Sequence, residues 1–490
     1  MSSSAALVSS NEKNDVQYIE DTTSALPPLP PTDPVLERRL LLKLDRVIIP
    51  LTIILYLLAY LDRGNAGNAK LQGLETSLHL TDTEFSVVLA CFYVAYIVFN
   101  IPGNVATKIL LPSTSIAMGA MLWGIASSLQ AATTSYAGII VCRLFIGIGE
   151  AFFGPSVPLY YSYWYKRDEI AFRNALFIGM GALAGTFGGL IAFGVQHIHS
   201  SISTWRILFL IEGLPTILFA IAIFFVLPSS PEKSKYLTDS ERELLLNRLS
   251  RDGLVDTGKF DWSGFRRAVT DYKVYLCGII YLGVNITLAS ISGFLPTIIK
   301  NMGYTAAEAQ LYTVPPYAVA TFLTVATSWV SDKSRLRGPF VAGYMALSAI
   351  GFGILMGVQH NQHVRYFATF LVVSGAFTCI PLMLSWCSNN CGSQSQRAVE
   401  VAMMNGIGQC FAILASFIFP SSEGPEYRKG FGLNIAFNGL AAVTALALMF
   451  LVKRENERRD RIEGPLPKED EGRVDTVGMH DLARGFRYVM

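Results

Sequence analysis

Residues 56–70, which read YLLAYLDRGNAGNAK, place an acid and a base side by side within an apolar run. The carboxylate of Asp62 can accept a proton. The planar guanidinium of Arg63 offers a fork of donors that suits a carboxylate ligand. A proton acceptor beside an anion receptor is the smallest set of groups that proton-coupled anion transport needs. We therefore expect Asp62 to bind a proton and Arg63 to bind an anionic substrate.

A second acid and base, Arg143 and Glu150, interrupt another apolar run. They are seven residues apart, or two helical turns, and so lie on one face of a helix. A charge inside a membrane costs a few kcal/mol, so retained charges pair with one another and face a cavity. We expect Glu150 to share the proton-coupling role with Asp62 and Arg143 to balance their charge. The alternative is that Arg143 and Glu150 only fix their helix against its neighbours.

Uncharged polar residues in other apolar runs are further candidates for the substrate site. Asn65 continues the polar face of the first run, and Asn285 interrupts the seventh. Asn405 and Gln409 are four residues apart in the eleventh run. We expect these four side chains to contact substrate. Aromatic residues offer either a wall for this site or ordinary packing, the commoner role of a membrane tyrosine; they are Tyr60, Tyr93, Tyr96 and Tyr160.

The composition indicates that these residues belong to a membrane protein. Of the 490 residues, 51% are hydrophobic and 16% charged, whereas a soluble protein has about a quarter of its residues charged. The apolar residues form blocks near the ~20 residues that cross a bilayer, which excludes a β-barrel with its alternating pattern. We expect an all-α membrane protein with twelve transmembrane helices, near 45–70, 83–106, 113–132, 136–158, 173–195, 206–228, 274–299, 309–330, 339–358, 365–386, 399–420 and 430–452.

The polar segments divide the chain into five parts. Residues 1–44 predict a disordered tail without a cleavable signal, 45–228 a first six-helix bundle, 229–273 a linker, 274–452 a second bundle, and 453–490 a C-terminal tail. Within the linker, Thr238 and Glu241 have capping-box spacing, which predicts an amphipathic helix over 238–251 that couples the halves. Basic residues gather in the linker and in the loops on its side of the membrane. This asymmetry predicts that both termini are cytosolic.

Two six-helix halves joined by a long linker are typical of transporters built from repeats, and four motifs narrow the comparison. They are LDRGNAGNA at 61–69, RLFIGIGEAFFGP at 143–155, GALAGTFGGLIAFG at 181–194 and SDKSRLRG at 331–338. Together they resemble the major facilitator superfamily, in particular its anion:cation symporter branch and the fungal allantoate permease family. The resemblance identifies Asp332, Lys333 and Arg337 as the superfamily's loop signature. The matching loop of the first half keeps only Lys108, and we assign all four residues a gating or structural role.

The resemblance implies a fold and a function. It implies the major facilitator fold and import of a carboxylate such as allantoate, nicotinate, pantothenate or biotin together with protons. We expect the plasma membrane as the location, with the vacuolar membrane as the alternative. The resemblance also assigns the roles of proton acceptor and anion receptor to the Asp62–Arg63 pair and to Arg143 and Glu150. Two alternatives remain: an exporter or proton antiporter of a secondary metabolite or drug, and a substrate sensor on a transporter fold.

Other classes of function lack their motifs. No nucleotide-binding loop, nucleophile arrangement or metal spacing is evident, so we expect neither an enzyme nor a protein with a cofactor or metal. Cys387 and Cys391 have helical spacing, but no second pair of metal ligands accompanies them. We therefore interpret them as two small buried residues and not as a zinc site. We expect the partners to be an organic anion, protons and the lipid bilayer, with no nucleic acid, and we expect a monomer.

Overall fold

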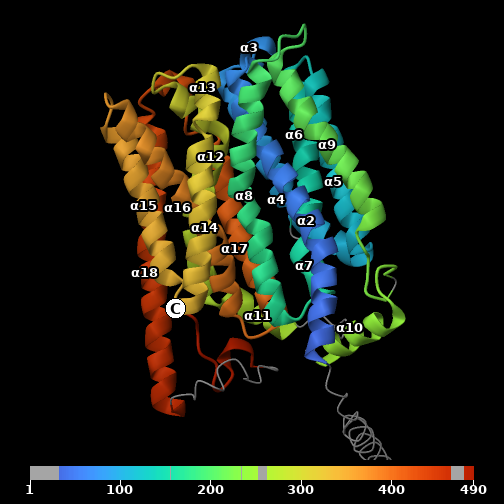
Figure 1. Ribbon diagram of the computed structural model, residues 1–490. Helices are drawn as coiled ribbons and strands as arrows, with labels where there is room; N and C mark the ends of the chain where they lie inside the picture. The colour runs from blue at the N-terminus through green and yellow to red at the C-terminus, as the bar shows by residue number, and fades with distance from the viewer. Residues whose placement is uncertain (1–32, 155, 233, 252–261, 465–478) are drawn as a thin grey trace, which may run out of the picture.

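The computed structural model describes residues 33–154, 156–232, 234–251, 262–464 and 479–490, and every regular element in these ranges is helical. The long helices stand side by side as one bundle (Figure 1). Helices α10 (Asp239–Arg251) and α11 (Trp262–Thr270) and residues 479–490 lie at one end, which we call the linker end. The short helices α3 (Leu74–Ser77) and α13 (Ala306–Leu311) lie at the opposite end.

Six long helices form each half of the chain. Those of the first half are α2 (Pro34–Leu71), α4 (Asp82–Ile109), α5 (Pro112–Leu129), α6 (Tyr136–Phe153), α8 (Arg167–Gln196) and α9 (Thr204–Val226). Those of the second are α12 (Tyr272–Lys300), α14 (Val314–Ser334), α15 (Gly338–Gly357), α16 (Gln362–Asn389), α17 (Gln394–Ala415) and α18 (Arg428–Glu463). Each of the twelve expected segments thus has a long helix.

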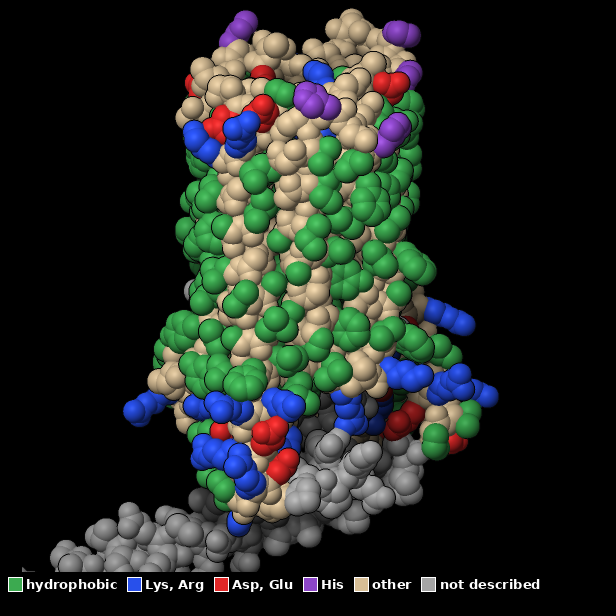
Figure 2. Space-filling model, turned by 90° about the vertical axis from the view of Figure 1, so that its left-hand side faces the viewer, with side chains coloured by type: hydrophobic (Ala, Val, Ile, Leu, Met, Phe, Trp, Pro, Cys, Tyr) green, Lys and Arg blue, Asp and Glu red, His purple; other side chains and the backbone are tan. Residues whose placement is uncertain are grey.

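The surface matches that of a membrane protein. Ten of the described helices are long and apolar enough to cross a bilayer, and α5 and α14 lie among them in the bundle. Figure 2 shows hydrophobic side chains over the middle of one face, with Lys and Arg side chains gathered toward the linker end and His side chains at the opposite end. The expected fold class, an all-α membrane protein, is confirmed.

Several helix ends carry caps that satisfy backbone groups left free at the end of a helix. The Asp33 carboxylate accepts a hydrogen bond from the Val35 amide at 2.9 Å, and Pro34 occupies the first turn. Capping boxes begin α4 at Thr81 and α13 at Thr305. The first helix therefore begins at Pro34, so the expectation of a disordered segment as far as residue 44 is wrong for residues 34–44; residues 1–32 lie outside the described ranges.

The fourth expected segment, 136–158, is divided between two helices. Helix α6 ends at Phe153, and α7 (Ser156–Ser162) follows it. Pro155, which separates them in the sequence, lies outside the described residues.

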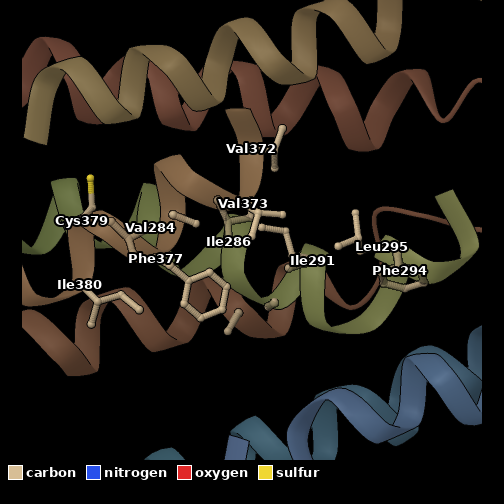
Figure 3. Packing of buried hydrophobic residues seen from close by; sticks show 14 of the residues in the cluster. Val284, Ile286, Ile291, Phe294, Leu295, Val372, Val373, Phe377, Cys379 and Ile380 are labelled. Atoms are coloured by element: carbon tan, nitrogen blue, oxygen red, sulfur yellow. The ribbon is translucent and has the colours of Figure 1, made fainter. Parts of the chain in front are cut away.

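The core of the second half is formed where α12 and α16 pack together. Their side chains interdigitate in Figure 3, where Ile286 and Val373 lie next to each other. Ile286, Val373 and Phe377 are each at most 4% exposed. Because protein interiors pack as densely as organic crystals, these contacts hold the two helices at a fixed rotation.

The two halves meet closely toward the opposite end. Gly67 on α2 and Gly185 on α8 allow this approach, because a Cβ at these positions would come within 2.7 Å of the Ser292 carbonyl oxygen and 2.5 Å of the Tyr317 ring, respectively. The glycine-rich motif of 181–194 is thus a helix-packing motif. The Gln310 side chain donates to the Asn68 carbonyl at 3.1 Å. Three hydrogen bonds between the two halves of the chain lie near this end.

The linker contains two described helices, one on each half. Helix α10 (Asp239–Arg251) matches the expected segment, and Thr238 and Glu241 form the expected capping box. Its Leu245 is fully buried in the core of the first half, and Lys43 on α2 bonds Glu241 at 2.7 Å. Helix α11 (Trp262–Thr270), which the sequence did not predict, packs on α17 of the second half. The described contacts of α10 are with the first half, so they do not support a coupling role for that helix alone.

The segment 479–490 is docked on the linker end of the second half. Asp481 accepts bonds from Arg267 at 2.8 Å, from Lys273 at 2.9 Å and from the Gln396 side chain at 3.0 Å. The Trp386 indole donates to the Val489 carbonyl at 2.9 Å. This segment therefore joins α11 to α12, α16 and α17.

Candidate functional site

The four charged residues singled out in the sequence lie together inside the first half. Asp62, Arg143 and Glu150 are at most 2% exposed, and the side chain of Arg63 is 15% exposed. Arg63 lies on α2 about 12 Å from the end of that helix, at ~1.5 Å per residue. The sequence thus correctly predicted a buried cluster of charges at membrane depth.

Within this cluster, Arg63 pairs with Glu150 and not with Asp62. Its Nε donates to Glu150 Oε2 at 2.5 Å. Although Asp62 is adjacent to Arg63 in the sequence, the carboxylate that would lose the guanidinium to an arriving anion is Glu150. A guanidinium carries five N–H donors, so a bond through Nε does not exhaust it.

Aromatic rings surround the Arg63 guanidinium. Its central carbon lies 4.8 Å from the ring centre of Tyr60, 5.2 Å from that of Phe92 and 5.0 Å from that of Tyr96. Cation–π attraction is strongest where water is excluded. We call these three rings and the Arg63–Glu150 pair the cage. Two of the four tyrosines considered in the sequence, Tyr60 and Tyr96, thus contribute to it, whereas Tyr160 bonds the Pro228 carbonyl and is fully buried.

Residues of the second half face this cage. Tyr281 on α12 interacts with Arg63, Tyr60 and Tyr96. The ring of Phe377 on α16 lies 6.5 Å from that of Tyr60. The cage is therefore located where the halves meet, which is the usual position of substrate sites in transporters built from two halves.

Asp62 makes a separate set of contacts. Its Oδ1 accepts hydrogen bonds from Ser127 at 2.5 Å and from Asn65 at 3.4 Å. Arg143 donates to the backbone carbonyl of Asp62 at 3.4 Å. Asn65 is completely buried. Its side-chain hydrogen bond is to Asp62 and not to a residue of the cage. This contact does not support the substrate-binding role that the sequence suggested for Asn65.

One buried acid was missed in the sequence. Glu212 on α9 is 2% exposed and interacts with Asp62 and Asn65. It is the single charged residue in the apolar run LFLIEGLPTILF. The cost of a membrane charge, which identified Asp62 and Glu150, applies equally to this residue.

The candidates in the second half lie on α12 and α17. Asn285 is buried and donates to the Tyr281 carbonyl at 2.9 Å. It also lies against Gly408, where a Cβ would come within 2.7 Å of the Asn285 amide nitrogen. Asn405 is half-buried, and Gln409 is buried with no hydrogen bond to its amide oxygen from a described residue. Asn285 is thus one helical turn from Tyr281, which faces the cage.

Comparison with known proteins identifies the family. Residues 52–420 match the Major Facilitator Superfamily. The chain belongs to this superfamily. It is 35% identical over 460 residues to the MFS-type transporter efuF of Hormonema carpetanum, covering 92% of each chain. It is also 31% identical over 433 residues to the high-affinity nicotinic acid transporter of Saccharomyces cerevisiae, covering 88% of this chain and 81% of that protein.

A solved structure shares the fold. The xylose transporter XylE from E. coli superposes with a TM-score of 0.65 at 15% identity, covering 82% of this chain and 97% of that one. The protein is accordingly a membrane transporter of the Major Facilitator Superfamily and not an enzyme.

The loop signature of this transporter forms a local network at the linker end. Arg337 bonds Asp332 and also donates to the Ser331 hydroxyl at 3.1 Å, and its backbone amide donates to the Met490 carbonyl. Lys333 lies 5.4 Å from the ring centre of Trp329. The side chain of Lys108 lies outside the described part of the structure. The described contacts agree with a structural role for Asp332 and Arg337.

A group of three potential metal ligands occurs where α16 meets α17. The ligand atoms of Cys387, Cys391 and Glu400 lie within 4.8 Å of one another. The Cys391 thiol donates to the Cys387 carbonyl and to Glu400, so it already has partners. The sequence did not predict the participation of Glu400, because only the fold brings it beside the cysteines.

Proposed function

We propose that the protein is a proton-coupled symporter of a small organic anion, of the monocarboxylate or vitamin-like class. The observation that carries this proposal is the cage, in which a buried guanidinium held by one carboxylate faces the junction of the halves. The likeness to a nicotinic acid transporter supports the same substrate class. This function also agrees with the resemblance of the motifs to the anion:cation symporter branch and its allantoate permease family.

The proposed coupling follows from competition for Arg63. A substrate carboxylate that binds the guanidinium displaces Glu150, which is 1% exposed. A buried carboxylate without its partner is costly, so Glu150 takes up a proton as the anion binds. The anion and the proton then favour each other's binding to the same extent, because thermodynamic coupling between two ligands is reciprocal. Arg143 and Asp62 lie beside this pair and adjust the balance of charge.

We place the linker end in the cytosol of the cell and both termini with it. The support is the abundance of Lys and Arg at that end. The three hydrogen bonds that join the halves near the opposite end support an arrangement that is closed to the outside. We further propose that the transporter works as a monomer in the plasma membrane.

Uptake by cells tests this function. Cells that lack their own carriers would express the protein and receive labelled nicotinate, allantoate, pantothenate or biotin in turn. We expect at least one carboxylate to accumulate against its gradient, with more uptake at acidic external pH and no accumulation after the proton gradient is collapsed. Accumulation of none of the four, or accumulation that persists without a proton gradient, would count against the proposal.

A further inference from the structure

Glu212 is a buried acid that the mechanism above does not use. Helix α9 packs against α5, α2, α8 and η1 (Gln130–Ala132). Of these elements, α2 alone presents a charged side chain that interacts with Glu212, namely Asp62; its other polar neighbour is Asn65. On α9 itself, Arg206 donates to the Ala131 carbonyl in η1. Among the described residues, therefore, the charged neighbour of Glu212 is a second carboxyl group, that of Asp62, and no Lys or Arg side chain interacts with Glu212.

The balance of charge makes this position unusual. The buried cluster contains three carboxyls and two guanidiniums. Arg63 pairs with Glu150, and Arg143 interacts with Asp62 and Glu150 but not with Glu212. If every group were ionised, the cluster would carry one uncompensated negative charge in a medium where such a charge is expensive. One proton bound by the carboxyls removes this charge.

Two of the three carboxyls lie at similar depth, and the third lies deeper. Counted from the opposite end at ~1.5 Å per residue, Glu212 is about 12 Å into α9, Asp62 about 14 Å into α2 and Glu150 about 21 Å into α6. Asp62 interacts with both of the other acids. Glu212 and Asp62 therefore lie nearer the opposite end than Glu150, and Asp62 links the other two acids because it interacts with both.

We propose that Glu212 is the first proton-binding group of a relay that runs from Glu212 through Asp62 to Glu150. A proton from the opposite end forms an O–H bond with the Glu212 carboxylate. That bond breaks when the proton passes to Asp62, and an O–H bond on Asp62 is exchanged in the same way for one on Glu150. The Asn65 amide donates to Asp62 at 3.4 Å and is also the uncharged polar neighbour of Glu212, whose two carboxyl oxygens have no hydrogen-bond partner among the described residues. This inference rests on the proposed proton-coupled function.

The test uses proteoliposomes and whichever of nicotinate, allantoate, pantothenate or biotin the unmodified protein accumulates. Glu212→Gln keeps the shape of the side chain but cannot pass on a proton. We expect it to lose at least about 90% of accumulation driven by a pH gradient and to retain exchange of labelled for unlabelled carboxylate. Thr216→Ala, one turn away and equally buried on α9, is the matched control and should retain both activities.

The possible results separate the two proposals. If the unmodified protein is proton-driven and Glu212→Gln accumulates the carboxylate with unchanged pH dependence, the relay is wrong and the symport proposal stands. If the unmodified protein is not driven by protons, the symport proposal fails, and the relay fails with it.

A second measurement does not depend on substrate. The infrared difference spectrum of the purified, lipid-reconstituted protein between acidic and alkaline pH reports carboxylic acid C=O bands. Glu212→Gln should remove one band that Thr216→Ala keeps, and an unchanged set of bands would overturn the inference. If Glu212→Gln cannot be purified, Glu212→Asp keeps an acid with a shorter side chain, and its band should appear at a shifted frequency.

Discussion

At the scale of single residues, the central feature is a guanidinium that is shared between a carboxylate and aromatic rings. Arg63 is held by Glu150 and lies against Tyr60, Phe92 and Tyr96. A carboxylate substrate that replaces Glu150 would gain charge-assisted hydrogen bonds, and a flat aromatic acid would also find rings to pack against.

Arg63→Ala tests the role of this guanidinium. Loss of a hydrogen bond to a charged group costs about 1.5–3 kcal/mol, which corresponds to a roughly 10- to 150-fold weaker apparent affinity. We expect the apparent affinity measured by uptake to weaken by at least this factor, while the amount of protein at the cell surface stays unchanged. Arg63→Lys should recover little, because an ammonium lacks the planar fork. Arg428→Ala, at a side chain that is 74% exposed, is the control; wild-type affinity in Arg63→Ala would show that substrate binds elsewhere.

Glu150→Gln and Asp62→Asn separate coupling from binding. Each change removes a proton acceptor while keeping the shape of the side chain. We expect both variants to lose accumulation against a gradient while exchange of labelled for unlabelled carboxylate continues. The measurement is the ratio of accumulated to external carboxylate in cells across a range of external pH. Glu426→Gln, on an exposed carboxylate, should behave as the unmodified protein. Unchanged accumulation in both variants would mean that the proton follows another route.

The residue types of this cluster were predictable from the sequence, but their pairing was not. The cost of burying a charge identifies Asp62, Arg63 and Glu150 wherever their helices lie. Which acid meets Arg63 depends on how α2 and α6 are rotated about their axes, and that rotation is set by packing against other helices. That Asn65 lies beside Asp62 follows instead from their spacing of three residues on one helix. Glu212 could have been found, since the cost of a buried charge applies to it without any structure.

At the scale of elements, the linker helices divide their contacts between the halves. The capping box and leucine pattern predicted α10, because both are local signals in the sequence. That α10 packs on the first half, and that residues 479–490 pack on the second, depends on contacts between distant segments and was not predictable.

Leu245→Ala tests the packing of α10. Leu245 is fully buried, and truncation of such a residue costs about 2–5 kcal/mol. We expect lower abundance and a lower unfolding temperature in detergent, without a change in which carboxylates compete for uptake. Leu246→Ala is the matched control, since Leu246 is 38% exposed. A changed ranking of competitors in Leu245→Ala would implicate α10 in substrate recognition.

Asp481→Asn tests the docking of residues 479–490. Burial would raise the pKa of Asp481, but hydrogen bonds and charge interactions with Arg267 and Lys273 outweigh it and hold that pKa well below its usual range. Removing one member of a buried ion pair costs about 3–5 kcal/mol. We expect the unfolding temperature of the purified protein to fall, whereas Asp239→Asn, at a side chain that is 98% exposed, should leave it unchanged.

The pH dependence of this stabilisation has a definite sign. Because the folded-state pKa of Asp481 is depressed, its contribution is fully present above the ordinary aspartate pKa of ~3.9 and is lost as the pH falls below that value. The difference in unfolding temperature between the unmodified protein and Asp481→Asn should therefore shrink as the pH falls through this window. A difference that grows on acidification would contradict the assignment.

At the scale of the whole molecule, contacts between the halves control the side of the membrane from which the cage is accessible. Three hydrogen bonds join the halves near the end opposite the linker, where Gly67 and Gly185 permit close approach. Transport to the other side requires these contacts to open. The twelve-helix layout was predictable because hydropathy is a local property, whereas the closed end depends on the packing of both halves.

Proton movement during carboxylate uptake tests the central claim most directly. Proteoliposomes with a pH-sensitive dye outside would receive nicotinate, allantoate, pantothenate or biotin, with a proton ionophore and Arg63→Ala vesicles as controls. Symport predicts that the medium becomes more alkaline when the transported carboxylate is added, as protons enter with the anion, and that the Arg63→Ala vesicles give no signal. Uptake of the carboxylate without a pH change, or with acidification of the medium, would contradict proton-coupled symport.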